Sequence, residues 1–261
     1  MKALLVCAGF WLLVSLVFPL ENILLPDMLR TLAAAWSLLL HGGLVHDLLV
    51  SLARTLAGVS CALIVGFSVG LGFGGRPGFS TYALPVLDFI RSIPIAMLFP
   101  LFIVITGIGE LSRLLMVITL ATPLLTIAIA SGLRKDFLNR ELNVWLALHR
   151  TQIPRWTRFL SLVWALLPSM LAGVKAAISL GLVMVIVSEM LFVANSGVGY
   201  QAYQAYNAFR VADMYAYVLV TGLVGFGLNA LFDGLINATF FEARPRNPNK
   251  AAIMTGRLPR R

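Results

Sequence analysis

Charged side chains are scarce in this chain of 261 residues. Asp, Glu, Lys and Arg together make up 12% of the positions, whereas 59% are hydrophobic and the mean hydropathy is +0.91. A soluble globular domain is typically about a quarter charged. The composition therefore excludes an ordinary soluble domain and indicates a chain that folds in a lipid bilayer.

Residues suited to catalysis or metal binding are equally scarce. The three histidines, His41, His46 and His149, fall in different segments, and the sequence has no H-E-x-x-H motif and no nucleophile elbow. Cys7 and Cys61 both lie in apolar segments without a partner spaced for a metal or redox site. No G-x-x-x-x-G-K-[ST] loop is present, so the chain cannot bind ATP by that route. We expect neither an enzyme nor a chain with a cofactor of its own.

The cations that are present follow the apolar segments. The formal net charge is +9, but Lys and Arg cluster between and beyond the hydrophobic runs. Nucleic-acid binding would need a basic face accompanied by a recognition motif, and none accompanies the charge. We therefore interpret the basic residues as a signal of membrane topology.

The hydrophobic runs predict an all-α membrane protein with six transmembrane helices. The run that follows Lys2 lacks an A-x-A cleavage pattern, which favours a retained signal anchor over a signal peptide. Residues 159–194 form an apolar stretch too long for one crossing, so we expect Pro168 to divide it into an interfacial lead-in and a span. The six expected spans cover residues 3–20, 48–75, 84–105, 114–133, 169–192 and 214–241.

Individual segments carry further expectations. The glycines of span 48–75 indicate close approach of a neighbouring helix. The prolines of span 84–105 predict a bend, and such bends often line a transport pathway. Residues 28–40 are expected to form an interfacial helix that begins at Pro26-Asp27 and ends at Gly42-Gly43, and residues 195–213 a Tyr-rich outer loop.

Basic residues fix the expected orientation. With both termini in the cytoplasm, 14 of the 20 Lys and Arg residues fall in inner segments and three in outer segments. This bias agrees with the positive-inside rule. The domain division that follows is an N-terminal anchor with an outer segment (1–47), a transmembrane domain (48–241) and a basic disordered tail (242–261).

The longest polar interruption spans residues 134–158. A short apolar run, 144–148, lies in its middle, and Trp145 and Leu148 share one helical face at i and i+3. Such a knob suits a groove on a cytoplasmic partner. The alternative is an amphipathic helix on the inner leaflet, held by anionic lipid. The cations of this loop are Arg134, Lys135, Arg140, Arg150, Arg155 and Arg158.

Several ionisable residues lie within the expected spans, and three of them are candidates for a transport pathway. A charge in hydrocarbon is costly, so Arg91, Lys175 and Glu189 should face a cavity, face each other or snorkel from a span end. Glu189 either faces the pathway or ties span 169–192 to the loop that follows it. Arg54, near an outer span end, can snorkel. The candidate pathway residues are Arg91, Ser92, Pro94, Lys175 and Glu189.

Three patches of the sequence carry a recognisable pattern. They are Arg91-Ser92-Ile93-Pro94 with Pro100-Leu101 and 107–112, Leu166-Leu167-Pro168 with 171–175, and Ser188-Glu189-Met190 with 196–200. These patches resemble the inner-membrane permeases of binding-protein-dependent ABC importers, and most closely the nitrate, sulfonate and taurine branch. The resemblance covers roughly residues 48–241.

This resemblance implies a type I ABC importer permease fold in a bacterial inner membrane. It implies a homodimeric or heterodimeric pore, two cytoplasmic ATPase subunits that bind ATP, and a periplasmic solute-binding protein. It also places a coupling helix in the loop 134–158, where Glu141 is the nearest acidic candidate and Thr151 stands where the family has a glycine. The coupling candidates are Glu141, Trp145, Leu148, Arg150 and Thr151.

The function implied is ATP-driven import of a small, anionic solute of the nitrate, sulfonate or taurine kind. Two alternatives come from other classes. One is a stand-alone channel or secondary carrier, which would show paired inverted repeats and midplane charges. The other is a degenerate, non-coupling partner in a heterodimeric permease.

Overall fold

The computed structural model describes residues 26–73, 79–134, 154–191 and 195–240, together with Gly9 and Trp11. In these ranges every regular element is a helix. The expected first span, the centre of the loop 134–158 and the tail from residue 242 lie outside the described residues.

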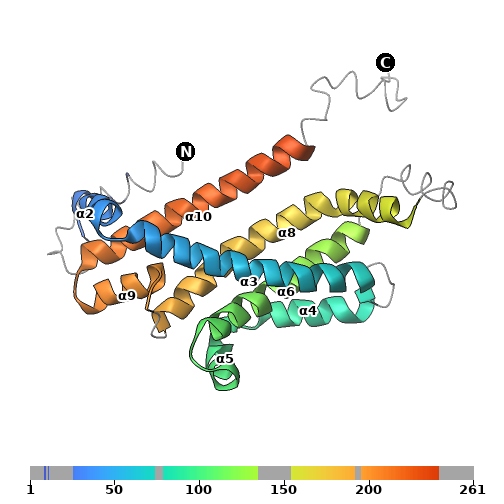
Figure 1. The fold of residues 1–261 in the computed structure, drawn as a ribbon, viewed down its shortest axis with the longest axis horizontal. Helices are drawn as coiled ribbons and strands as arrows, with labels where there is room; N and C mark the ends of the chain where they lie inside the picture. The colour runs from blue at the N-terminus through green and yellow to red at the C-terminus, as the bar shows by residue number, and fades with distance from the viewer. Residues whose placement is uncertain are drawn as a thin grey trace, which may run out of the picture.

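Four long helices run side by side and give the molecule its elongated shape (Figure 1). They are α3 (Leu44–Phe73), α6 (Glu110–Arg134), α8 (Arg155–Leu191) and α10 (Val211–Phe240). Each contains a stretch of 24 to 29 residues that is long and apolar enough to cross a membrane. These stretches confirm four of the expected spans, while the total of six is not settled by the described residues.

Helices α3 and α6 pack in parallel along a row of small residues. A Cβ added to Gly58, Gly66 or Gly70 of α3 would come within 3.0 Å of a side chain on α6. The expectation of close helix contact at the glycines of this span is therefore confirmed, because these positions leave room for the neighbour. The facing residues on α6, in the same order along the chain, are Val117, Leu125 and Ile129.

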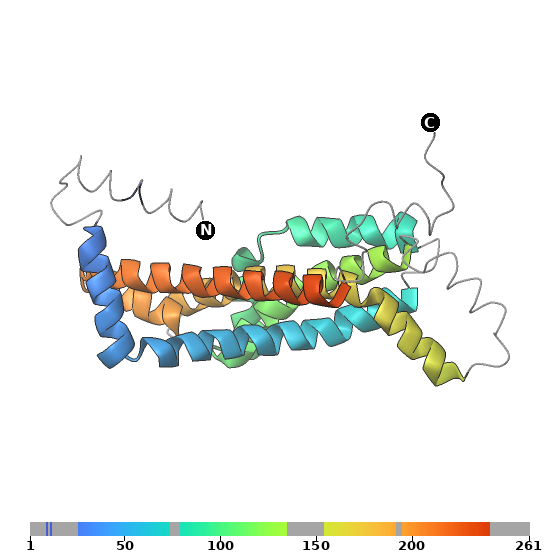
Figure 2. The same cartoon turned by 90° about the horizontal axis from the view of Figure 1, so that it is seen from above.

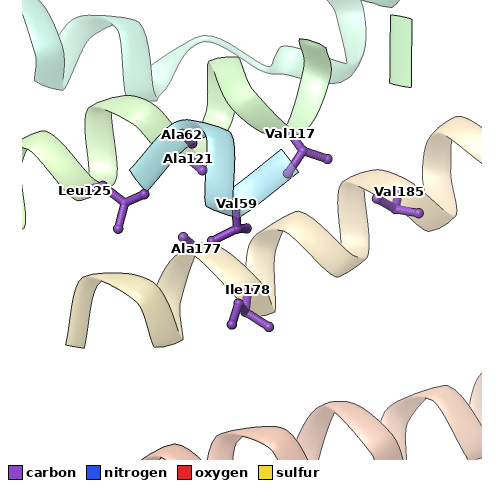
Figure 3. Packing of buried hydrophobic residues seen from close by; sticks show 8 residues of the cluster. All are labelled: Val59, Ala62, Val117, Ala121, Leu125, Ala177, Ile178 and Val185. Atoms are coloured by element: carbon purple, nitrogen blue, oxygen red, sulfur yellow. The ribbon is translucent and has the colours of Figure 1, made fainter. Parts of the chain in front are cut away.

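Helix α8 runs antiparallel to this pair and completes the core. A Cβ at Gly173 would lie 2.7 Å from Cβ of Ala128 on α6, and one at Gly132 of α6 would lie 3.0 Å from Cβ of Ser169. Figure 3 shows the small and branched side chains that meet between the three helices, with α10 beyond α8. The labelled residues are Val59, Ala62, Val117, Ala121, Leu125, Ala177, Ile178 and Val185.

The expected span 84–105 is broken into two helices. Helix α4 (Leu84–Ser92) ends at Ile93, the 3-10 turn η2 (Ile95–Leu98) follows, and α5 (Phe99–Thr106) leaves at an angle of 79°. Pro94 accounts for the break: it holds Ile93 in an extended conformation (ψ 128°), as the residue before a proline prefers. The expected bend is thus present as a full break, preceded by the π-helical turn η1 (Phe79–Ala83).

Pro168 does not break the helix as expected, although the expected change from a lead-in to a span does fall close to it. Helix α8 continues through this residue for 37 residues, and its membrane-compatible part begins at Leu166. A proline within a long helix removes one hydrogen bond and bends the axis, and packing on both sides can hold the helix together across it. Leu166 is buried. Figure 2 shows the first part of α8 angled away from the bundle.

Two shorter helices lie at one end of the bundle. Helix α2 (Met28–His41) crosses the ends of α3 and α10 (Figure 2), and it begins after Asp27 and ends at Gly42 as the sequence predicts. Helix α9 (Val198–Asn207) occupies most of the segment expected to be an outer loop. It packs against both α8 and α10. We call this end of the molecule the α9 end.

Candidate functional site

A buried carboxylate, that of Glu189, lies at the centre of a polar network at the α9 end. Its side chain, near the last turn of α8, has no exposed surface. Nη1 of Arg54 donates to Oε1 at 2.7 Å, and Oγ of Ser51 lies 2.9 Å from each carboxylate oxygen. The backbone N–H of Gly199 donates to Oε2 at 2.9 Å. Every oxygen of this buried group is therefore hydrogen-bonded, as a charge in an apolar surrounding requires.

The same network caps helix α9. The first N–H groups of a helix have no partner inside the helix and carry its positive dipole end. Here the N–H of Gly197 donates to Oδ1 of Asp47 at 3.0 Å, and the N–H of Val198 donates to Oγ of Ser51 at 3.0 Å. With Gly199 bound to Glu189, three successive amides are satisfied by side chains of α3 and α8. Two buried carboxylates thus stand where a helix N-terminus favours anions.

Gly197 is required at this junction for a steric reason. Its φ is +115°, a conformation that side chains rarely allow, and a Cβ there would overlap the Glu189 carboxylate. The backbone can approach the carboxylate only because this position lacks a side chain.

Arg54 joins the buried carboxylate to the beginning of α6. Its Nε and Nη2 donate to the two oxygens of Glu110 at 2.8 and 2.6 Å, and its Nη1 also reaches the backbone oxygen of Ser196. Glu110 in turn accepts from Nη1 of Arg113 at 2.8 Å. The expectation that Arg54 snorkels is wrong. Its side chain is only 11% exposed, and its guanidinium is bound on one side by Glu110 and on the other by Glu189. We call Asp47, Ser51, Arg54, Glu110 and Glu189 the outer network.

The sequence left two roles open for Glu189: facing the pathway, or tying its span to the segment that follows. The contacts of Glu189 are those expected for the second role. Its bond with the N–H of Gly199 joins α8 to the segment that follows it, and Arg54, its ion-pair partner, holds the backbone oxygen of Ser196 in the same segment. That the carboxylate also meets the transported solute stays a prediction.

The sequence contained a signal for the members on α3. Asp47, Ser51 and Arg54 recur at i, i+4 and i+7, which places them on one face of a helix. A polar stripe within an otherwise apolar span indicates a buried polar partner. The partner residues, Glu110 and Glu189, lie on other helices, and no local pattern links them to the stripe.

Three other predicted pathway residues lie together at the break between α4 and η2. Arg91 pairs with Asp88 one turn earlier at 3.1 Å, with about half of each side chain exposed. The hydroxyl of Ser92 donates a hydrogen bond to the backbone oxygen of Asp88 at 2.9 Å, and Pro94 directly precedes the 3-10 turn. The polar contacts of Arg91 and Ser92 are both made with Asp88, on the same helix.

Lys175 lies far from Glu189 on the same helix. The two residues are 14 positions apart, which corresponds to about 21 Å along α8. Nζ of Lys175 instead contacts Oδ1 of Asp233 on α10 at 2.6 Å. The predicted pathway residues therefore occupy three separate places: the α9 end, the α4 break and the α8–α10 seam.

The predicted coupling residues lie outside the described residues. These are Glu141, Trp145, Leu148, Arg150 and Thr151. The helix ends on either side of them, the last turn of α6 and the first part of α8, both lie at the end of the bundle opposite α9 (Figure 1). Within the described part of the chain, no group of three or more His, Cys, Asp or Glu side chains could hold a metal ion.

Comparisons with known proteins agree with this architecture. Residues 55–244 match the family model described as "Binding-protein-dependent transport system inner membrane component". The permease subunit in a structure of the MetNI methionine ABC transporter in inward-facing conformations superimposes with a TM-score of 0.60 at 19% identity, covering 76% of this chain and 96% of that chain. At this identity the likeness shows the fold.

Several curated relatives are permeases. A probable ABC transporter permease protein of Brucella melitensis is 29% identical over 80% of this chain and 83% of its own length. The putative aliphatic sulfonates transport permease protein SsuC of Bacillus subtilis is 26% identical over 86% and 81%. The nitrate import permease protein NrtB of Synechocystis is 25% identical over 70% and 65%.

The family model covers well over half of the chain, and the fold agrees with it. Permeases of this family work together with ATPase and substrate-binding components and are transport subunits, not enzymes. The chain is a multi-pass membrane protein with the type I ABC importer permease fold, and it belongs to the family of binding-protein-dependent transport system inner-membrane components.

Proposed function

We propose that this permease forms the translocation pathway of an ATP-driven importer for a small anionic solute. The observation that carries the proposal is the family match over residues 55–244, and the solute class is supported by relatives named for sulfonates and nitrate. Both solutes are anions at neutral pH. A periplasmic solute-binding protein delivers the solute, and a second permease subunit, identical or different, completes the pore.

The energy comes from separate ATPase subunits that bind the ATP, since the chain has no phosphate loop of its own. The loop 134–158 couples the permease to the ATPase, and Trp145 and Leu148 are the apolar anchor that lies in a groove of the ATPase. Glu141, Arg150 and Thr151 flank this anchor, and the remaining cations of the loop meet anionic lipid of the inner leaflet. Movement of the loop is passed to α6 and α8, the two helices that it joins.

The orientation follows from the same loop. Both termini and the basic loop lie in the cytoplasm of a bacterial inner membrane, and the α9 end faces the periplasm. Residues 48–241 form the permease domain, preceded by an anchor and outer segment (1–47) and followed by a basic tail (242–261). Arg91, Ser92, Pro94, Lys175 and Glu189 remain the candidate pathway residues.

Reconstitution into liposomes tests the proposal. The permease is purified together with the ATPase and solute-binding protein encoded beside it, and uptake of radiolabelled taurine, methanesulfonate, nitrate and methionine is measured with ATP inside or outside the vesicles. We expect uptake of at least one anion, dependent on ATP on the loop side and on the binding protein. Uptake by the permease alone without ATP would instead favour a channel or secondary carrier. A preference for methionine would contradict the proposed solute class.

A further inference from the structure

A polar seam runs between α8 and α10 inside the membrane-spanning part. Lys175 contacts Asp233 at 2.6 Å, and Oγ of Ser179 donates to Oδ1 of Asn229 at 2.9 Å. Each pair is one helical turn from the other on both helices, so the four side chains form two successive rungs between antiparallel helices. All four residues lie within the stretches Leu166–Leu191 and Val211–Ala238, which are long and apolar enough to cross a membrane.

The charged rung is open to its surroundings. The side chain of Asp233 is 58% exposed and that of Lys175 is 29% exposed. Lys175 lies nine residues and Asp233 five residues from the inner ends of their spans, which corresponds to about 14 Å and about 8 Å. An exposed ion pair at this depth is costly against hydrocarbon, so intramembrane charges face water-filled cavities or protein. We take this face of the chain to line an aqueous pathway.

An apolar cavity of about 350 Å³ adjoins the neutral rung. Ser179 and Asn229 are among its lining residues, and the rest of the lining is almost entirely apolar. The cavity continues along α8 and α10 toward the α9 end, where Met190, Val198 and Met214 contribute. The seam is therefore apolar toward the periplasmic end and charged toward the cytoplasmic end.

We propose that the Lys175–Asp233 pair is an anion-exchange site in the translocation pathway. In the absence of solute, Asp233 is the anion bound to Lys175. When the solute arrives, its anionic group takes the place of the Asp233 carboxylate on Nζ of Lys175, while its uncharged part lies against the apolar lining. This inference rests on the proposed function and assigns the solute-contacting cation within it.

The pairing explains how one site can both accept and release an anion. A lysine without a partner at this depth would hold an anion tightly. The neighbouring carboxylate keeps the site neutral when empty and competes with the solute when it is full. Transport needs binding that is favourable enough for entry and weak enough for exit, and a competing carboxylate provides this balance.

Thiol chemistry at the neutral rung tests the site without knowledge of the solute. Ser179→Cys is introduced after Cys7→Ser and Cys61→Ala, and the assembled complex in proteoliposomes is treated with two membrane-impermeant methanethiosulfonates. One reagent is the anionic ethylsulfonate and the other is the cationic ethyltrimethylammonium. The ratio of their reaction rates reports the charge that a solute would meet beside Lys175.

We expect both reagents to reach Ser179→Cys, and Asp233→Asn to raise the anionic-to-cationic rate ratio at least about fivefold, because it leaves the Lys175 charge uncompensated. Lys175→Gln should lower the ratio by a similar factor. Asp233→Glu keeps the charge and should leave the ratio unchanged. Leu180 is also exposed, at 46%, but it is apolar, and we assign its face of α8 to lipid. Leu180→Cys should therefore react much more slowly with both reagents.

Three results would overturn the inference. Ser179→Cys that reacts with neither reagent would place the seam against lipid or a partner subunit. A ratio that does not respond to Asp233→Asn or Lys175→Gln would separate the pair from the pathway, and equal reaction at Leu180→Cys would remove the assignment of the face. If the complex with Asp233→Asn fails to assemble, Lys175→Gln still tests the site, because it should lower the anionic-to-cationic rate ratio.

Uptake in the same vesicles keeps the two proposals apart. Wild-type vesicles without ATP-dependent anion uptake contradict the proposed function, whatever the reagents do. Wild-type vesicles that transport, with a rate ratio unaffected by the charge variants, contradict the anion-exchange site alone.

Discussion

Arg54 and Glu189 are 135 positions apart in the sequence, yet Nη1 of one lies 2.7 Å from Oε1 of the other. The contact joins α3 to α8, and the carboxylate has no exposed surface. Removing one member of a buried ion pair leaves the other charge uncompensated, which typically costs about 3–5 kcal/mol. The pair should therefore be one of the most sensitive points for the stability of the α9 end.

Glu189→Ala should destabilise the purified protein by about 3 kcal/mol, because Arg54 loses its buried carboxylate partner and the N–H of Gly199 loses its acceptor. The measurement is the apparent melting temperature in detergent, where we expect a decrease of several degrees. Asp88→Asn, which breaks the exposed pair with Arg91, is the control and should change stability by less than about 1 kcal/mol. A double-mutant cycle with Arg54→Met and Glu189→Met should give a smaller combined loss than the sum of the two. Equal effects of the buried and exposed pairs would contradict this account.

The close contact between Gly173 and Ala128 predicts that a larger side chain on α8 can be compensated by a smaller one on α6. Gly173→Ala would place two Cβ atoms 2.7 Å apart, so we expect a loss of about 1–3 kcal/mol from overpacking. Adding Ala128→Gly should recover part of that loss, because the space then opens on the other helix. Gly72→Ala, where nothing lies within 4 Å of the new Cβ, is the matched control. Thermal unfolding in detergent measures all three, and no recovery in the double variant would argue against this packing.

Phe209 holds a backbone conformation that normally belongs to glycine. It follows the last turn of α9 with φ +55°, and the N–H of Arg210 reaches the oxygen of Ala205 while that of Phe209 reaches Tyr206. This is the Schellman arrangement, in which glycine is the usual residue. The Phe209 side chain is 86% exposed, so Phe209→Gly should stabilise the protein by about 1 kcal/mol. Phe209→Ala keeps the strain and should not. If Phe209→Gly lowers the melting temperature in detergent, the ring makes a contact that this conformation does not reveal.

Trp145→Ala with Leu148→Ala tests the coupling loop. If the loop holds the ATPase through these side chains, the double variant should reduce ATP-driven uptake by at least about tenfold while the permease still inserts and purifies. Trp36→Ala on α2, an equally large exposed side chain at the other end of the bundle, should leave uptake unchanged. Co-purification with the ATPase measures the loss directly. Unchanged uptake would instead support the alternative in which the loop only rests on lipid.

Cysteine labelling tests the orientation. In a background with Cys7→Ser and Cys61→Ala, Thr151→Cys should be labelled by an impermeant maleimide only after the cytoplasmic side is opened. Asn207→Cys, exposed at the end of α9, should be labelled in cells whose outer membrane alone is permeable. Labelling of Thr151→Cys from the periplasm would reverse the topology and remove the basis for coupling.

The sequence predicted the long helices well because each span is a local property. Hydrophobic runs of sufficient length defined α3, α6, α8 and α10, and the glycines of α3 indicated the close contact with α6. Pro94 and Pro168 show the limit of that reasoning. Both remove a backbone donor, yet the helix breaks only at Pro94, because the packing around each proline decides the outcome and is not a local property.

The polar contacts could be predicted only in part. Glu189 and Lys175 were identifiable as charges within apolar spans, but their partners Arg54 and Asp233 lie on other helices. Without knowledge of which helix faces which, a buried and paired charge near a span end cannot be distinguished from one that snorkels, and Arg54 is such a case. The register between helices supplies the missing information.

The parallel packing of α3 against α6 has a mechanical consequence. Helices α3 and α6 interlock at three places along their length, at Gly58, Gly66 and Gly70. They cannot slide past each other without a steric clash, so they shift together as one stiff strut. One tip of that strut adjoins the basic loop after Arg134, and the other tip carries Arg54 and Glu110. A displacement delivered at the tip beside this loop must therefore arrive at the other tip, where the contacts around Glu189 either break or move with it.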